Sequence, residues 1–197
     1  MLFIDGENFT FRAENFARAE GLILEPGPYY EPDAFMWMPS ALPETFWAYC
    51  GENAKRLGSL EPRAVRSHYY TSVVGSDEKR DDIRGALWRL GFSPSVFRKD
   101  KGTKRAKGVD VTLTKDVLSH AYQDNYDVAF LVAGDGDYVP LAEEVKRRGK
   151  ILFVAFFDGD PAVVGLSPEL RLAADRFFEM NASFLATWKA HADQKKS

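Results

Sequence analysis

Val128-Ala129-Phe130-Leu131-Val132-Ala133, followed at once by Gly134-Asp135-Gly136-Asp137, is the stretch of sequence that decides the fold of this chain. An uninterrupted apolar run of this length is typical of a strand buried on both faces, and such strands occur in parallel sheets covered by helices. The two aspartates follow the strand directly, so they stand at its carboxyl end. Ligands of parallel α/β sheets bind beyond that end, so the stretch predicts both a fold class and the place of a site.

The rest of the chain alternates between strand-like and helix-like patterns. Further strands are predicted at residues 2–4, 65–74, 95–97 and 151–157. Helices are predicted at about residues 9–18, 43–57, 77–90, 109–122 and 138–148. Strands that alternate with helices favour an α/β fold with a mostly parallel sheet. The simplest doubly wound order of the five strands is 3-2-1-4-5, in which strands one and four are neighbours where the following loops diverge.

Two segments depart from this alternation. Residues 21–45 contain five prolines and several aromatic residues, which predicts an irregular insertion because proline breaks helices. Aromatic side chains there can stack on bases, but core packing or a homodimer interface are alternative uses. Residues 167–191 are predicted to form a final helical region. No linker separates two parts, so a single domain over residues 1–197 is expected.

The composition narrows the class of protein. The chain has 197 residues, a formal net charge of −3 and one cysteine, Cys50. A single cysteine excludes an internal disulfide and agrees with a reducing cytoplasm. No apolar run has transmembrane length and the N-terminus lacks a basic signal region, so a cytoplasmic protein without a membrane segment is expected. Because the net charge is negative, nucleic-acid binding would require a local basic patch.

Aspartates from separate segments are predicted to meet at one edge of the sheet. Asp5 leaves the first strand, Asp135 and Asp137 leave the fourth, and Asp110 stands on the helix that leads into the fourth. Taken singly, Asp137 is also explained by capping of the helix that follows it, and Asp5-Gly6 by an ordinary strand-end turn. Together, their carboxylates suit a hard divalent cation such as Mg²⁺ or Mn²⁺. Such an ion activates water against a phosphate, so metal-assisted chemistry on a phosphate backbone is expected.

The polar neighbours of these aspartates have other predicted roles. Asn8 is expected to orient Asp5 or to contact a phosphate, and capping of the first helix is an equal alternative. Glu7 is expected to face solvent and not to bind the metal. Asp116 follows Asp110 by six residues, about 120° around a helix, so it is either an accessory to the site or a plain surface charge.

A basic segment stands immediately before Asp110. Six of the ten residues at 98–107 are lysine or arginine. Cations in this place can neutralise phosphates and attract a polyanion that the carboxylates alone would repel. A solvated loop is the alternative. The candidate nucleic-acid contacts are Lys99, Lys101, Lys104, Arg105 and Lys107.

These motifs resemble the NYN family of PIN-like ribonucleases, particularly its LabA-like branch. The matching segments include Ile4-Asp5-Gly6-Glu7-Asn8, Ser67-His68-Tyr69-Tyr70, Lys107-Gly108-Val109-Asp110-Val111 and Gly134-Asp135-Gly136-Asp137-Tyr138. The resemblance implies a PIN-like three-layer α/β/α sandwich and Mg²⁺- or Mn²⁺-dependent cleavage of RNA. It also implies a metal site on Asp5, Asp110, Asp135 and Asp137, and it makes Lys107 the leading phosphate contact. An endonuclease is preferred over an exonuclease.

Two alternatives follow from details of the motifs. Ala133 stands where the family usually has serine, which supports a catalytically weak or inactive RNA-binding or regulatory protein that retains the fold. A Toprim-like phosphotransfer domain also combines an early acidic strand end with an Asp-x-Asp motif. That alternative requires Glu7 at the metal, whereas the NYN hypothesis requires Asp5 and Asp110.

Overall fold

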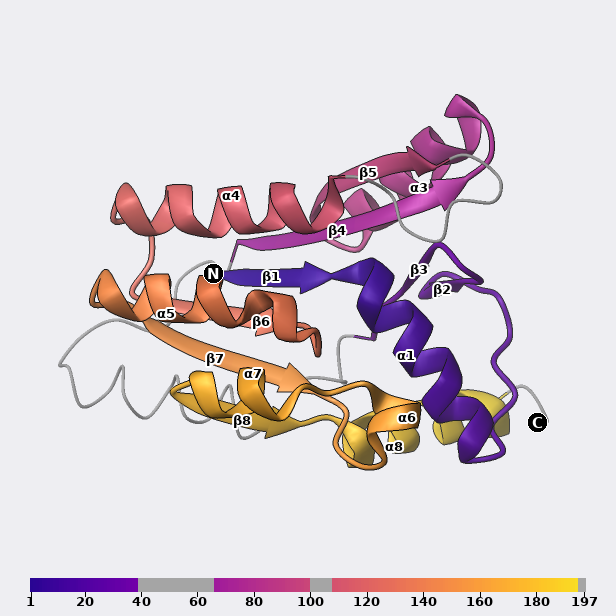
Figure 1. Ribbon diagram of the computed structural model, residues 1–197. Helices are drawn as coiled ribbons and strands as arrows, with labels where there is room; N and C mark the ends of the chain where they lie inside the picture. Colours follow the sequence, from indigo (N-terminus) through magenta and orange to yellow (C-terminus); the bar gives the residue numbers. More distant parts are fainter. Residues whose placement is uncertain (39–65, 100–107, 195–197) are drawn as a thin grey trace, which may run out of the picture.

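The centre of the protein is a six-stranded sheet, shown in Figure 1 in a computed structural model that describes residues 1–38, 66–99 and 108–194. In spatial order the strands are β5 (Ser93–Lys99), β4 (Ser67–Val74), β1 (Leu2–Asp5), β6 (Val128–Val132), β7 (Ile151–Phe156) and β8 (Arg176–Glu179). All neighbours pair in parallel. The five strands predicted from the sequence are β1, β4, β5, β6 and β7 in chain order. Their predicted spatial order 3-2-1-4-5 is confirmed, with β1 beside β6.

The sixth strand was not expected from the sequence. β8 interrupts residues 167–191, whose pattern predicts one helical region, and α7 (Pro168–Ala173) and α8 (Asn181–Gln194) lie on either side of it. Its register runs from Phe153↔Arg176 to Phe156↔Glu179, so it occupies the edge of β7. A strand of four residues is too short for its alternation to stand out from a helical pattern.

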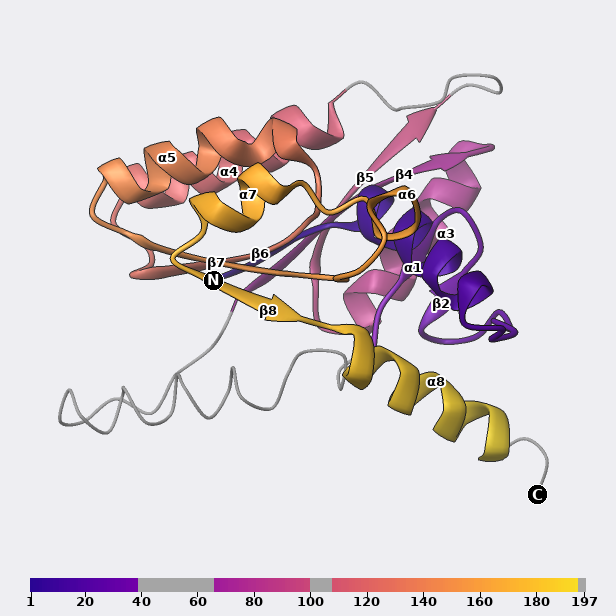
Figure 2. The same ribbon diagram turned by 60° about the horizontal axis from the view of Figure 1, so that its bottom comes forward.

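Helices cover both faces of the sheet, as Figures 1 and 2 show from two directions. One layer contains α4 (Val109–Tyr122), α5 (Val139–Arg147) and α7. The other contains α1 (Gly6–Ala19), α3 (Asp77–Arg89) and α8, with the short α6 (Pro161–Val164) beside α1. The predicted three-layer α/β/α sandwich is therefore confirmed.

The central strand β1 contributes to the core on both sides. Leu2 and Ile4 pack in the core beneath α1 and α3, whereas Phe3 packs beneath α4 and α5. Successive side chains of a strand point to opposite faces, and here both faces are covered. Every residue from Leu2 to Asp5 is buried as a result, so the strand ends with a carboxylate that is shielded from solvent.

The described part of residues 21–45 forms a small hairpin of β2 (Tyr30–Glu31) and β3 (Phe35–Met36). Tyr30 and Trp37 are 6% and 5% exposed, so they serve the core and are not available to stack on bases. The Tyr69 hydroxyl donates to the Met36 carbonyl at 2.9 Å and ties the hairpin to β4. The predicted helix at 43–57 and Cys50 lie outside the described residues. No helix within the described ranges is long and apolar enough to cross a membrane.

Candidate active site

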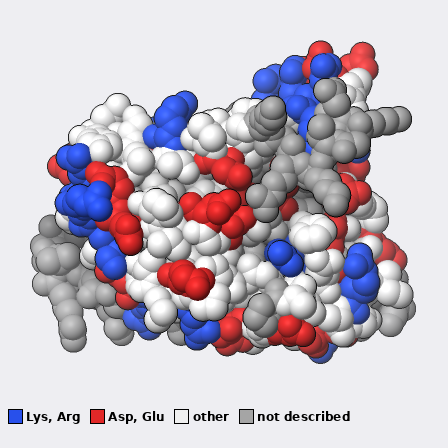
Figure 3. Space-filling model, in the orientation of Figure 1, with Lys and Arg blue, Asp and Glu red and all other residues white. Residues whose placement is uncertain are grey.

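A pocket of about 490 Å³ lies where β1 ends and α1 begins. Three of the predicted carboxylates, Asp5, Asp110 and Asp135, line this pocket. Figure 3 shows acidic side chains gathered on this face, over the junction of β1 with the beginnings of α4 and α5. The sheet order brings them together because β1 and β6 are neighbours and end at the same edge.

Asp5 is the buried member of the group. Its side chain caps the N-terminus of α1, where one carboxylate oxygen accepts a hydrogen bond from the backbone amide of Asn8 at 3.0 Å. The other oxygen accepts from the Tyr138 hydroxyl at 2.8 Å. Burial is the main cause that raises the pKa of Asp5 to about 7; the hydrogen bonds from Asn8 and Tyr138 oppose this shift, and the nearby charges of Asp110 and Glu7 add to it. A buried carboxylate among acidic neighbours is stabilised in its charged form by a cation.

Gly6 allows α1 to start directly against the sheet. A Cβ atom at this position would lie 2.0 Å from the ring of Tyr69, which is itself fully buried on β4. Only glycine permits that approach. The turn from β1 into α1 is therefore held close to β4, and Asp5 faces the pocket at the start of the helix.

Tyr138 connects carboxylates from different segments, a role that sequence reasoning missed. Its hydroxyl donates to Asp5, and it also hydrogen-bonds Asp110 Oδ1 at 3.3 Å. Burial, followed by the charges of the two aspartates, raises the pKa of Tyr138, so the phenol stays protonated as a donor. Its position directly after Asp137 in the acidic motif was the available signal, but the contact itself depends on the fold.

Asn8 positions the loop that carries Asp135. The side-chain oxygen of Asn8 accepts a hydrogen bond from the Gly134 amide at 3.1 Å, whereas Asp5 caps α1. The capping alternative for Asn8 is therefore wrong. Asp135 in turn accepts from the Asp137 amide at 3.1 Å and caps the 3-10 helix η2 (Gly136–Tyr138). Asp137 is exposed and is not among the residues that line the pocket.

Glu7 lines the pocket, so the prediction that it faces open solvent is wrong. Its carboxylate accepts hydrogen bonds from Ser72 Oγ at 2.5 Å and from Lys99 Nζ at 3.0 Å. The Lys99 and Glu7 side chains are 14% and 23% exposed. Lys99, at the end of β5, is thus already paired with an acid in this structure. Lys101, Lys104, Arg105 and Lys107 lie outside the described residues.

Asp116 and Ala133 lie away from the pocket. Asp116 accepts a hydrogen bond from the Tyr70 hydroxyl at 3.1 Å and pairs with Lys115. Ala133 is fully buried in the core beneath α4 and α5. Asp116 therefore supports the packing of α4 against β4, and it is neither a pocket residue nor an isolated surface charge.

The donor atoms of the pocket suit a hard divalent cation. Carboxylate oxygens from Asp5, Glu7, Asp110 and Asp135 line one cavity, and Mg²⁺ and Mn²⁺ prefer such ligands. Across residues 1–38, 66–99 and 108–194, however, no three acidic, histidine or cysteine side chains are arranged to hold a metal ion. The chemistry of the donors fits an ion, while the arrangement described here is not a complete coordination shell.

A family model of the NYN domain matches residues 1–181, which include every element of the sheet and the pocket. The chain belongs to the NYN domain family. This family consists of PIN-like nucleases that generally depend on a divalent metal, and membership favours the NYN hypothesis over the Toprim-like one.

Further comparisons of this NYN protein concern its fold. A crystal structure of a protein of unknown function from Vibrio parahaemolyticus is similar, with a TM-score of 0.54 and 23% identity over 93% of each chain. At this identity the likeness concerns the fold alone. No curated protein matches the chain.

Proposed function

We propose that this NYN protein is a metal-dependent ribonuclease of the LabA-like branch that hydrolyses RNA phosphodiester bonds as an endonuclease. The observation that carries the proposal is the pocket in which Asp5, Asp110 and Asp135 meet, with a buried Asp5 whose pKa is about 7. Carboxylates grouped at such a cost in desolvation are typical of metal-assisted sites. In this proposal residues 1–197 form one nuclease domain that acts in the cytoplasm.

Asp5, Asp110 and Asp135 would hold the metal in this proposal, and Asp137, which is exposed and outside the pocket lining, would join them only after its side chain rotates toward the ion. Bound there, Mg²⁺ or Mn²⁺ would supply positive charge to stabilise the phosphate and would lower the pKa of a water molecule. The chain itself contributes orientation. The Tyr138 hydroxyl hydrogen-bonds both the Asp5 and the Asp110 carboxylates. The Asn8 side chain accepts a hydrogen bond from the Gly134 amide and so fixes the loop before Asp135.

The basic segment would bind the phosphates of the RNA on both sides of the cut. Lys99 lines the pocket at the end of β5, where it pairs with Glu7. Cations close to the carboxylates lower the electrostatic barrier to an approaching polyanion. The proposed contacts are Lys99, Lys101, Lys104, Arg105 and Lys107.

The test is cleavage of a labelled RNA pool with Mg²⁺, Mn²⁺ or EDTA, alongside a circular RNA that only an endonuclease can open. Asp135→Asn and Asp110→Asn should lose metal-dependent cleavage by at least ~100-fold, as expected for ligands of a catalytic ion. Asp127→Asn is the matched control, because Asp127 is a fully exposed carboxylate that pairs with Lys150 at 3.7 Å. Cleavage that persists in EDTA would contradict the proposal.

A second candidate is an RNA-binding or regulatory protein that does not cleave. Ala133 in place of the family's usual serine, together with the incomplete coordination shell in the described residues, favours this alternative. Its expected result is RNA binding by the wild type without cleavage under any metal condition. Cleavage by the wild type that Asp135→Asn abolishes would exclude it.

A further inference from the structure

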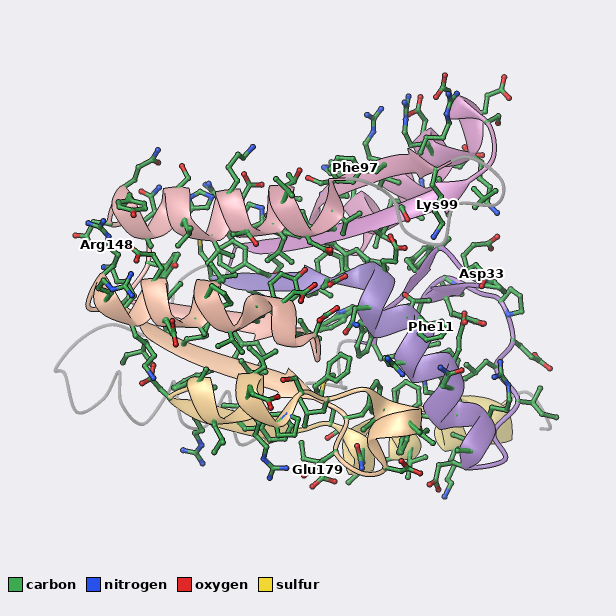
Figure 4. All side chains as sticks on the ribbon, viewed as in Figure 1. Phe11, Asp33, Phe97, Lys99, Arg148 and Glu179 are labelled. Atoms are coloured by element: carbon green, nitrogen blue, oxygen red, sulfur yellow. The ribbon has the colours of Figure 1, made fainter. Side chains whose placement is uncertain are left out.

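The pocket extends past the carboxylates along α1, where Phe11 and Arg12 line it. Phe11 and Arg12 follow Asn8 by three and four residues, so both lie on the face of the helix that carries Asn8. Phe11 is 56% exposed, and Figure 4 shows it on the same side of the molecule as the pocket residues Asp33 and Lys99. This half of the pocket therefore presents an aromatic ring and a guanidinium.

Arg12 has no acidic partner among the described residues, and its buried Nε has no hydrogen-bond partner. Glu14 and Asp33 line the same part of the pocket, but the Glu14 carboxylate accepts hydrogen bonds from the Tyr30 hydroxyl and the Asp33 backbone amide, and neither acid forms an ion pair with Arg12 among the described residues. A guanidinium carries five donors and stays charged. Leaving such a group partly buried and unpaired is costly, and an anion in the pocket would remove that cost.

The backbone holds Arg12 in place. A Cβ atom on Gly165 would lie 2.2 Å from the guanidinium carbon of Arg12, and Gly165 has a φ of +62°. The loop between α6 and α7 therefore leaves a space that the arginine fills and that any side chain on Gly165 would occupy. The guanidinium carbon also lies 5.3 Å from the centroid of the Phe11 ring. An arginine oriented before ligand arrives loses less freedom on binding.

We propose that Arg12 binds an RNA phosphate that flanks the scissile one, and that Phe11 stacks on the adjacent unpaired base. This inference rests on the proposed function. Asp5 and Arg12 are seven residues apart, about 10 Å along a helix axis. A phosphate bound at Arg12 would therefore lie close along the RNA to the scissile phosphate held at the carboxylates. Arginine suits bidentate phosphate contact. Stacking on a side chain requires an unpaired base, so the substrate is a single-stranded segment of RNA.

The test measures binding of a short fluorescein-labelled oligouridylate by anisotropy in EDTA, over a range of salt concentrations, so that cleavage does not interfere. Arg12→Met should bind ~10-fold more weakly, with the slope of log K against log salt reduced by about 0.7, the value for one single-strand phosphate. Phe11→Ala should also bind ~10-fold more weakly, and the loss should be absent with a blunt RNA duplex. Arg18→Met is the control, since Arg18 is on the same helix, is not among the pocket residues and, within the described part of the chain, donates to Asn15.

The outcomes separate this inference from the proposed function. Wild-type cleavage of RNA, with unchanged affinity and salt slope in Arg12→Met, would overturn the phosphate assignment and leave the nuclease intact. Equal losses by Phe11→Ala on single strand and duplex would overturn the stacking assignment. Phe11 is exposed, so its variant tests the surface even where Arg12→Met fails to fold. A wild type that neither binds nor cleaves RNA would overturn both proposals.

Discussion

Tyr138 donates a hydrogen bond of 2.8 Å to Asp5, from a residue 133 positions further along the chain. The same hydroxyl is 3.3 Å from Asp110 Oδ1. One neutral donor thus joins the carboxyl end of β1, the first turn of α4 and the loop after β6. Since hydrogen bonds to charged acceptors contribute roughly 1.5–3 kcal/mol, this residue contributes to both the position and the ionisation of the carboxylates.

We expect Tyr138→Phe to lower metal-dependent cleavage and Mn²⁺ affinity by about tenfold, because the loss of the donor increases the repulsion between Asp5 and Asp110. Mn²⁺ affinity is measured by titration, independently of activity. Tyr126→Phe is the matched control. Its hydroxyl is also buried and donates to the Val117 carbonyl at 3.0 Å, away from the pocket. Equal behaviour of the two variants would contradict the role of Tyr138.

The stability of the metal-free protein should depend on Asp5. Its folded-state pKa of about 7 lies above the ordinary value of 3.8 for an aspartate, so the folded state binds this proton more tightly than the unfolded state. The contribution of protonated Asp5 is complete below about pH 4 and is lost as the pH rises through about 7. Wild type loses this contribution between pH 5 and pH 8, whereas Asp5→Asn does not. The free energy of unfolding of Asp5→Asn minus that of wild type should therefore be larger at pH 8 than at pH 5, by on the order of 2–4 kcal/mol.

Urea denaturation in EDTA at the two pH values measures this difference. Adding Mg²⁺ at pH 8 should raise the stability of the wild type and leave Asp5→Asn nearly unchanged, since ligand binding stabilises the state that binds it. A stability difference that does not vary with pH would show that Asp5 is not desolvated as described. Asp127→Asn, which changes an exposed carboxylate, should show no such dependence on pH.

The ion pair between Glu7 and Lys99 should be coupled energetically. The two side chains are mostly buried and 3.0 Å apart, so a double-mutant cycle of Glu7→Gln and Lys99→Met should give about 1 kcal/mol of coupling. The exposed pair of Glu31 and Lys79, 3.8 Å apart, is the control and should give a coupling near zero. Coupling of equal size in both pairs would contradict the special position of Glu7.

Asn8 should affect activity through Asp135. In Asn8→Ala the Gly134 amide loses its acceptor, which should cost about 1–3 kcal/mol of stability and lower kcat about tenfold with little change in KM. Asn15→Ala is the control, because Asn15 is on the same helix, outside the pocket lining, and its side chain accepts a hydrogen bond from Arg18 at 3.2 Å. Steady-state kinetics and thermal melts distinguish the two. A rise in KM alone would instead place Asn8 in direct contact with RNA.

The strand order and the meeting of Asp5 with Asp135 were predictable because they follow from chain direction and from one buried strand. The apolar run at 128–133 requires a doubly covered parallel strand, and the parallel sheet brings the ends of β1 and β6 to one edge. Asp110 followed from the adjacent helix. The strand β8 was not predictable, because four residues carry too little pattern and only the edge of β7 selects them.

The sequence by itself determined the α/β class, the central order of strands and the group of acidic residues, because these depend on local patterns repeated along the chain. Only the tertiary structure decided which side chains share hydrogen bonds. It placed Glu7 against Lys99, left Asp137 exposed outside the pocket lining and brought Tyr138 to Asp5. Such contacts join residues far apart in the chain, and their geometry depends on packing that no local pattern encodes.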